Sequence, residues 1–407
     1  MANLNRYSVF ILTLIFVQFF RIKISPIPLG YESFYAVIIF FLCAAYFLFN
    51  SHKNNKLMFK KHLFIYLFFA GLNMISCYIF RGQSIVVSFT AWSSLLYIFL
   101  YIGFSNFKLS IRDLEKVIEW MFFIILISYI VQNLAYPILL FNLDIAEEKL
   151  EMDLRVRIFS DGILSLGGIY YLNKFFEEKK TRYAIYFFLF LIVVFLQGYR
   201  ILMFASFVSA FVLFYRYYGF MNKKTFIYGG ILCILFIGFM QTGMFKEKIG
   251  QIVERSETDN LDNEDYVRVA SLIYFYNDHF KSDTEMFLGS GCSLTRDRHV
   301  STYSDYMNYL KERYHFFPID WGLIGLSWEA GIPFVICFIL LMLRVVFLKV
   351  EKRYYYLGVW QLFLLISVTK ALSYMHTNLV YMAIVLLIAE RAHSEYVKKH
   401  TTDMNAP

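Results

Sequence analysis

Residues 183–218 read YAIYFFLFLIVVFLQGYRILMFASFVSAFVLFYRYY, two apolar runs separated only by Gln197-Gly198-Tyr199-Arg200. Each run has close to the number of apolar residues that an α-helix needs to cross the hydrocarbon core of a membrane. Backbone polar groups in lipid must be satisfied within the segment, which favours helices. The stretch therefore predicts two membrane helices joined by a tight turn.

The composition extends this pattern to most of the chain. Hydrophobic residues make up 59% of the 407 residues, aromatic residues 20% and charged residues only 17%, whereas soluble domains are roughly 45–50% apolar and 25% charged. We predict an all-α, polytopic integral membrane protein. Its twelve predicted spans are 7–24, 31–49, 63–80, 84–104, 117–141, 158–176, 183–197, 199–218, 225–243, 321–347, 354–371 and 373–390.

The spans divide the chain into three predicted parts. Residues 1–243 hold spans one to nine, residues 244–320 form one large extracytoplasmic loop that caps a cavity, and residues 321–407 hold the last three spans and a tail. Lys and Arg concentrate in alternate connections, and cytoplasmic connections keep the positive charges. Both termini and the tail are therefore predicted to be cytoplasmic, with the 244–320 loop outside.

The large loop has a pattern of its own. Residues 265–281 and 302–314 place apolar side chains at helical spacing, which predicts two amphipathic helices. Thr302 with Asp305 predicts the start of the second helix. Such helices lie on a membrane surface or cap a cavity.

Four arginines fall on the predicted outer side: Arg155, Arg157, Arg200 and Arg268. A guanidinium group stays charged and binds phosphate oxygens through two parallel hydrogen bonds. Arg200 is the most informative of the four, because a charge at the end of a span is costly unless it snorkels or is paired. Together they predict a diphosphate site. The alternative for each is an interfacial arginine that contacts lipid headgroups.

A Gly-x-Gly turn, Gly289-Ser290-Gly291, follows Arg268 in the same loop. Glycines allow backbone amides to approach an anion closely, so Gly289 and Gly291 are added to the predicted diphosphate site. An ordinary loop turn is the alternative. A Rossmann or Walker nucleotide site is excluded, because neither a strand–helix unit nor Gly-Lys-Ser/Thr accompanies the turn.

Three residues near the end of the loop are candidates for a general base, which must lie within hydrogen-bond reach of an acceptor hydroxyl. Asp320 lies at the mouth of the span that begins at residue 321, and His315 shortly precedes it. Glu329 lies inside that predicted span, where a carboxyl group needs a partner or a cavity. The alternatives are an interfacial ring for His315 and a structural hydrogen bond for Glu329.

Metal, cofactor and nucleic-acid binding have no support in the sequence. The acidic cluster in residues 259–265 lacks the glycine and the spacing of a calcium loop, and no His-Glu-x-x-His motif is present. Most of the net charge of +8 lies in the predicted inner connections, where topology and anionic lipid headgroups explain it. We therefore expect membrane lipids as partners, and no nucleic acid, metal or cofactor.

In their order and spacing these features resemble the bacterial O-antigen polymerase and O-antigen ligase superfamily of integral-membrane glycosyltransferases. The resemblance covers mainly residues 150–335. Ligases of the superfamily usually carry His-Asn where this chain has Asp320-Trp321, which favours a polymerase. The matching segments are Gln197-Gly198-Tyr199-Arg200, Arg268 with Phe287-Leu288-Gly289-Ser290-Gly291, and Asp320-Trp321-Gly322-Leu323 through Glu329-Ala330-Gly331-Ile332-Pro333.

The resemblance implies polymerisation of undecaprenyl-diphosphate-linked repeat units into O-antigen or capsular polysaccharide. The reaction would occur at the outer face of the cytoplasmic (inner) membrane. The arginines would hold the diphosphate of the glycan donor, and Asp320, His315 or Glu329 would deprotonate a hydroxyl of the lipid-linked glycan acceptor. A chain-length regulator and a flippase are the partner proteins it suggests. Two alternatives stay open: an O-antigen ligase that transfers finished glycan to a lipid or protein, and a polysaccharide exporter or flippase with the same topology.

Overall fold

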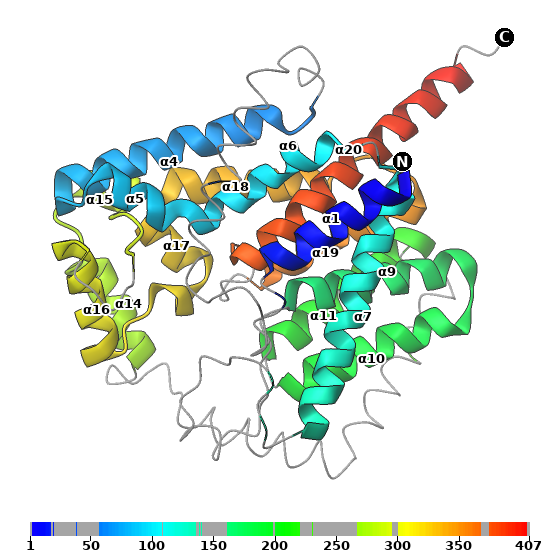
Figure 1. Cartoon of the computed structure of the whole chain (residues 1–407), viewed down its shortest axis with the longest axis horizontal. Coiled ribbons are helices and arrows are strands. Elements are labelled where there is room, and N and C mark those ends of the chain that lie inside the picture. The colour runs from blue at the N-terminus through cyan, green and yellow to red at the C-terminus, as the bar shows by residue number, and fades with distance from the viewer. Residues whose placement is uncertain are drawn as a thin grey trace.

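The computed structural model describes residues 2–17, 19, 38, 57–107, 109–135, 138, 140, 161–197, 200–219, 230, 267–294, 300–367 and 374–404. Within these ranges the protein is helical and has no strand, as the sequence predicts (Figure 1). The predicted spans at 31–49 and 225–243 lie almost entirely outside the described residues, as does the first part of the loop, 244–266.

The helices follow the predicted spans closely where the chain is described. In chain order they are α1 (Ala2–Phe16), α4 (Lys60–Arg81), α5 (Ile85–Trp92), η2 (Ser93–Phe99), α6 (Leu100–Ser105), α7 (Ile111–Ala135), α9 (Asp161–Glu178), α10 (Thr181–Gln197), α11 (Arg200–Tyr218), α14 (Val267–Asn277), α15 (Asp283–Leu288), α16 (Thr302–Tyr314), η3 (Pro318–Trp321), α17 (Leu323–Ala330), α18 (Ile332–Val346), η4 (Lys352–Tyr354), α19 (Tyr355–Ile366) and α20 (His376–Met404). The η elements are 3₁₀ helices.

Among the described residues, three helical stretches are long and apolar enough to cross a membrane. These are Lys60–Arg81, Ile85–Ser105 and Ile201–Tyr218. Shorter apolar helices occupy Asn5–Phe16, Thr181–Gln197 and Ile332–Val346. The structure is therefore that of a helical protein with candidate membrane spans, and the count of twelve stays a prediction.

The span predicted at 321–347 forms two helices, so the prediction of one continuous helix is wrong. Gly331 separates α17 from α18 with φ 93° and ψ 151°, a backbone conformation essentially restricted to glycine. Pro333 lies in the first turn of α18, where a missing N–H costs little. α17 has 8 residues, too few to cross a membrane.

The larger helix bundle packs around α9, which contacts α7, α10, α11, α19 and α20. Two adjacent glycines allow this close approach. A Cβ atom at Gly167 would lie 2.2 Å from Cδ2 of Phe122 in α7, and one at Gly168 would lie 2.4 Å from Cδ1 of Phe190 in α10. Small residues commonly bring membrane helices together in this way. Phe122 and Phe190 are both fully buried there.

A second, smaller core joins the loop helices to the rest of the protein. It contains Cys77 of α4, Phe275 of α14, Tyr303 and Met307 of α16, and Trp328 of α17. Figure 1 shows α14 and α16 beside each other at one end of the molecule, near α15, α5 and one end of α4. The two amphipathic helices predicted in the loop are confirmed as α14 and α16, and both contribute side chains to this smaller core.

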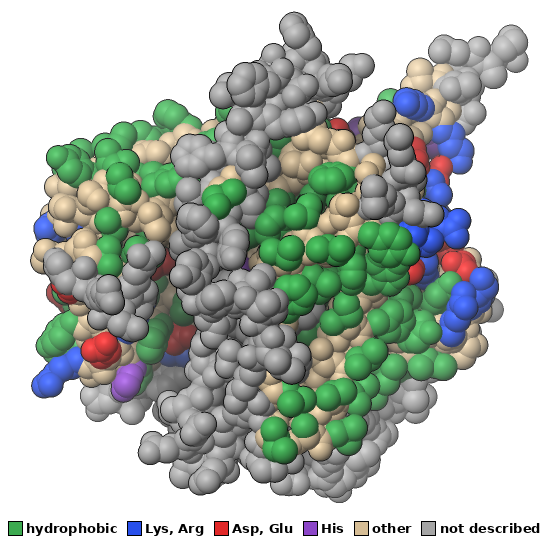
Figure 2. Space-filling view, viewed as in Figure 1, with side chains coloured by type: hydrophobic (Ala, Val, Ile, Leu, Met, Phe, Trp, Pro, Cys, Tyr) green, Lys and Arg blue, Asp and Glu red, His purple; other side chains and the backbone are tan. Residues whose placement is uncertain are grey.

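The connections predicted to be cytoplasmic meet one another at the other end of the bundle. Arg344 contacts His62, Arg216 donates to the Val346 carbonyl at 2.7 Å, and Arg391 donates to the Leu109 carbonyl. Figure 2 shows charged side chains gathered at two edges of the molecule, with patches of hydrophobic side chains on the described parts of the face between them. This arrangement agrees with the charge bias, while the orientation in a membrane stays a prediction.

Candidate functional site

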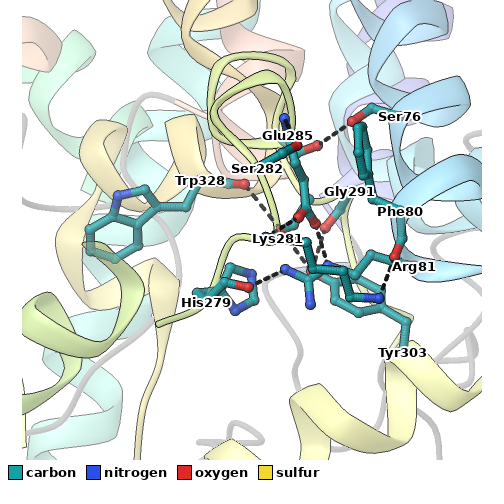
Figure 3. A network of polar contacts seen from close by, with 12 residues as sticks. Ser76, Phe80, Arg81, His279, Lys281, Ser282, Glu285, Gly291, Tyr303 and Trp328 are labelled. Carbon is teal, nitrogen blue, oxygen red and sulfur yellow. Dashed lines mark hydrogen bonds and ion pairs between the residues drawn. The ribbon is translucent and has the colours of Figure 1, made fainter. Parts of the chain in front are cut away.

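The end of α4 holds the loop through a buried ion pair (Figure 3). Arg81 Nε donates to Glu285 Oε1, and Arg81 Nη2 donates to the carbonyl of His279. The side chains of Arg81 and Glu285 are 8% and 0% exposed. Because neither charge reaches bulk water freely, loss of one partner is expected to cost about 3–5 kcal/mol. This ion pair therefore fixes α15 against α4.

The residues before α15 give the ion pair its geometry. Ser282 Oγ caps α15 by accepting from the Glu285 N–H at 3.2 Å, and Glu285 Oε2 accepts from the Lys281 N–H at 2.7 Å. The pattern resembles a capping box in which the glutamate turns back to the residue before the cap. Lys281 Nζ also donates to the Phe80 carbonyl at 2.6 Å (Figure 3). Both carboxylate oxygens of Glu285 are therefore bonded.

Asn73, fully buried in α4, joins the loop to α17. Its Nδ2 donates to the Leu288 carbonyl at 2.7 Å and to the Glu329 carbonyl at 2.8 Å. Its Oδ1 accepts from Trp92 Nε1 at 2.9 Å, so the amide uses its donors and its acceptor. Ser76, on the same helix, donates to the Gly289 carbonyl at 3.0 Å. α4 is thus the surface on which the loop and the C-terminal end of α17 meet.

The Gly-x-Gly segment runs along the end of α17. The Ser290 N–H donates to the Trp328 carbonyl at 2.8 Å, the Gly291 N–H to the Glu329 carbonyl at 2.9 Å, and the Gly289 N–H to α15. These amides are already satisfied by main-chain carbonyls. This geometry does not favour the predicted contact of Gly289 and Gly291 with a diphosphate.

Close packing explains why glycine occupies these positions. A Cβ atom at Gly289 would lie 2.4 Å from the backbone nitrogen of Gly331, and one at Gly291 would lie 2.3 Å from Sγ of Cys77. Both glycines have positive φ, 84° and 95°, where a side chain is strained. The sequence motif is therefore a contact between loop and helix.

Asp320 and Glu329 lie near the two ends of the η3–α17 segment, and both carboxylates are close enough to Tyr374 to influence its hydroxyl electrostatically. Asp320 is exposed, whereas Glu329 is half-buried near the end of α17. The hydroxyl of Tyr374 lies within Coulomb range of both carboxylates. It is buried and has no hydrogen-bond partner in the described part of the chain. Two carboxylates and an unpartnered hydroxyl are groups that can accept and pass on a proton.

The environment of Glu329 adjusts its proton affinity. Burial raises the pKa of the Glu329 carboxyl to about 7, an effect that the charge of Lys311 partly offsets. A carboxyl group with a pKa near neutrality both binds and releases a proton readily. Among the described residues its carboxylate has no hydrogen bond, so the alternative of a structural hydrogen bond has no support in the described residues.

His315 and His279 differ in the exposure of their side chains. His315 ends α16 with φ 57° and is exposed, so its role as a base stays a prediction. His279 is 3% exposed and lies beside Arg81, and burial together with that positive charge lowers the pKa of its ring to about 3. His279 therefore stays neutral and contributes to the contact of loop and α4.

The predicted arginine cluster is described only in part. Arg268 is exposed on α14, and its carbonyl accepts from Ser271 Oγ at 2.8 Å. Arg200 begins α11, but its side chain lies outside the described part of the structure, as do Arg155 and Arg157 entirely. The convergence of these arginines on one diphosphate stays a prediction.

Sequence reasoning missed the residues that assemble the site. Arg81 lies at the predicted outer end of a span, which is the same signal that singled out Arg200, but its partner Glu285 is distant in sequence. Asn73 is a polar residue inside a predicted span, and such residues usually make a specific hydrogen bond. No sequence pattern distinguishes Tyr374 as a site residue, because tyrosines are abundant throughout the chain.

The described residues hold no candidate metal site, and the comparisons with known protein families and curated proteins find no match. In the ranges that the structure describes, no three His, Cys, Asp or Glu side chains are grouped so that they could hold a metal ion. No known protein-family model matches the chain, and no curated protein matches its sequence. The resemblance to the O-antigen polymerase and ligase superfamily therefore rests on the residues quoted above.

Proposed function

We propose that the protein is a membrane glycosyltransferase that polymerises undecaprenyl-diphosphate-linked oligosaccharide repeat units. The product would be O-antigen or capsular polysaccharide at the outer face of the inner membrane. The observation that carries the proposal is that the short η3–α17 segment places Asp320 at an exposed position and Glu329 at a partly buried one, with the buried, unpartnered hydroxyl of Tyr374 within Coulomb range of both. Asp320 also occupies the position that distinguishes the polymerases from the ligases of the superfamily that this chain resembles.

The proposed reaction forms one C–O bond and breaks another. A hydroxyl oxygen of the acceptor glycan attacks the anomeric carbon of the donor, whose bond to the diphosphate oxygen breaks. Asp320 takes the hydroxyl proton, because it is exposed at the mouth of the segment where an acceptor can approach. Glu329 and Tyr374 behind it hold or pass on that proton. The lipid diphosphate leaves with the electron pair of the broken bond.

Positive charge is needed where the diphosphate leaves. Arg268 is the exposed arginine of the docked loop, and Arg155, Arg157 and Arg200 are its predicted companions. Guanidinium groups stabilise charge that develops on phosphate oxygens. The proposal requires neither metal nor nucleotide sugar.

The distribution of charges favours a polymerase over an exporter. An exporter is expected to carry ionisable side chains through several helix interiors. In the described residues, the buried ion pair Arg81–Glu285 lies where the loop meets α4, and Lys174–Glu119 lies near the connection of α9 and α10. Charged pairs near the ends of helices fit a site at a membrane surface.

Deletion of the gene followed by a gel of surface polysaccharide tests the proposal. A product with a single repeat unit is expected, restored to long polymer by the wild-type gene. Long polymer that is not attached to its acceptor would indicate a ligase instead, and polymer that accumulates inside the cell would indicate an exporter.

Complementation with variants separates chemistry from folding. Asp320→Asn should leave the one-repeat product at normal protein level. Glu312→Gln is the matched control, since Glu312 is exposed on α16 and has no assigned role; it should restore long polymer.

A further inference from the structure

A polar cavity of about 740 Å³ lies between the start of α7, the end of α9 and the start of α10. Its volume falls within the range of about 300–1,000 Å³ typical of small-molecule sites. The wall carries six Lys or Arg side chains, four Glu side chains and six aromatic rings. The predicted orientation of the chain places this cavity on the cytoplasmic side.

Three of the six cations are neutralised within the wall. The ion pairs are Lys174 with Glu119 at 2.8 Å, Lys180 with Glu178 at 2.6 Å, and Arg353 with Glu395 at 2.9 Å. Tyr170 also donates to Glu119 at 2.8 Å. These ion pairs use three of the four carboxylates in the wall. The charges of those three carboxylates are therefore not available to balance the other cations.

The other three cations of the wall differ from these in having no ion pair in the described residues. Within the part of the chain that the structure describes, Arg112, Lys116 and Arg182 make no ion pair. Arg182 donates to the Tyr183 hydroxyl at 2.9 Å, and its guanidinium lies 4.8 Å from the centre of that ring. This contact holds one edge of the guanidinium and leaves other donors available.

The fourth carboxylate of the wall, Glu115, balances little of the positive charge of these three cations. Glu115, near the start of α7 and outside the candidate spans, accepts from the Tyr356 hydroxyl at 3.0 Å. Burial raises the pKa of the Glu115 carboxyl to about 7, so it is partly protonated at neutral pH. The cavity therefore carries an excess of positive charge.

We infer that this cavity binds a phosphate-bearing organic anion, with the phosphate at Arg112, Lys116 and Arg182. The cavity is far larger than a bare phosphate needs, and Tyr171, Tyr183 and other rings line the remaining space. Aromatic faces suit a sugar or a base, and guanidinium forks suit phosphate oxygens. The ligand is a soluble nucleotide or sugar phosphate, or the phosphate headgroup of a membrane lipid.

Binding to the full-length protein in nanodiscs of neutral phosphatidylcholine tests this inference. The soluble probe is uridine diphosphate, and the lipid probe is dioctanoyl phosphatidic acid, both at low salt. Arg112→Gln with Arg182→Gln should weaken binding at least tenfold, and because both side chains are exposed, the fold should be kept. Lys61→Gln with Arg313→Gln removes the same charge from exposed positions on α4 and α16 that do not line the cavity, and should leave binding unchanged.

The two probes separate the sources of the phosphate. Saturable binding of uridine diphosphate that depends on the two arginines supports a soluble ligand. Binding of phosphatidic acid alone, with the same dependence, supports a lipid headgroup. The inference is overturned if neither probe binds, or if the Arg112/Arg182 variant and the Lys61/Arg313 control lose binding equally, since the effect would then be general attraction to positive charge.

Discussion

Arg81 and Glu285 are separated by 204 residues in the sequence, yet their side chains form an ion pair with almost no access to solvent. The pair lies where the helix α4 ends and the large predicted loop begins to pack on it. An ion pair in such surroundings specifies one geometry, because a shifted loop would leave both charges buried and alone. The part of the predicted loop around α15 is therefore folded against α4 in a defined position.

Arg81→Leu should destabilise the protein by about 3–5 kcal/mol, because Glu285 would remain buried without its partner. Thermal unfolding of the purified protein and proteolysis between residues 279 and 288 would measure the effect. The double variant with Glu285→Leu should recover much of the loss. Lys399→Gln is the control, since its pair with Glu351 is largely exposed and worth at most about 1 kcal/mol. Equal stability of Arg81→Leu and the control would contradict the prediction.

Gly289→Ala should displace the loop from α17, because the new Cβ atom would lie 2.4 Å from the backbone nitrogen of Gly331. The control is Gly82→Ala. Gly82 also has positive φ, 67°, but nothing lies within 4 Å of its ideal Cβ position, so it reports only the backbone strain of about 1–2 kcal/mol. Thermal unfolding should show a clearly larger loss for Gly289→Ala. Equal losses would mean that close packing adds nothing at this position.

Local sequence patterns predicted the loop helices α14 and α16, but not how these helices pack against α4 and α17. The spacing of apolar residues predicted the helix at 302–314, and α16 has the same bounds. Its N-cap is Ser301, whose Oγ accepts from the Ser304 N–H at 3.0 Å, so the capping residue predicted at Thr302 is off by one position. Ser301 and Thr302 both carry a hydroxyl that can cap a helix, so the sequence does not distinguish them. The backbone geometry shows that Ser301 is the N-cap.

The sequence analysis missed the helix boundary at Gly331 because the surrounding residues are mostly apolar. The span predicted at 321–347 is mostly apolar, and that signal outweighed Gly331 and Pro333, which together are typical of a helix boundary. The hydrogen bonds of Asn73 to Leu288 and Glu329 depend on the tertiary fold. No local pattern reveals them, so the contact of loop and α17 could not have been predicted from one sequence.

The protein should lose stability as the pH falls below about 6.5, partly because of His279. The folded state lowers the pKa of this ring to about 3, whereas an unfolded histidine has a pKa near 6.5. Between these two values the unfolded chain binds more protons, so the stability contributed above pH 6.5 is lost as the pH falls towards 3. Melting temperatures measured from pH 4 to pH 8 would show this slope.

His279→Gln should flatten that slope, because the side chain no longer titrates. Asn277→Gln is the control: Asn277 is exposed at the end of α14 and carries no titratable group, so the slope should stay as in the wild type. An unchanged slope in His279→Gln would assign the acid sensitivity to other groups.

Arg200→Lys and Arg268→Lys should each strongly impair polymer formation while leaving the protein level unchanged. Lysine keeps the positive charge but not the planar fork that binds two phosphate oxygens at once. Surface polysaccharide from complemented deletion cells would show the loss as short products. Normal polymer from both variants would make the two arginines interfacial anchors and move the diphosphate site elsewhere.

Asp320→Asn should abolish elongation, because the amide keeps the shape of the side chain but cannot accept the acceptor proton. A general base contributes on the order of 100- to 10,000-fold to a rate, so its loss exceeds the scatter of a polymer assay. Glu329→Gln should also reduce the rate, and Glu312→Gln on α16 should be silent. Full elongation by Asp320→Asn, with an inactive His315→Gln, would transfer the role of base to the histidine.

Tyr374→Phe decides whether the tyrosine belongs to the same proton path. Because its hydroxyl has no hydrogen-bond partner among the described residues, removing it should not lower the melting temperature, since no hydrogen bond is lost. A slower rate at unchanged stability would therefore be an effect on chemistry. The pH profile should change with it, since the charges of Asp320 and Glu329 both act on this hydroxyl. A Tyr374→Phe protein with the wild-type rate and pH profile would leave the two carboxylates to act without it.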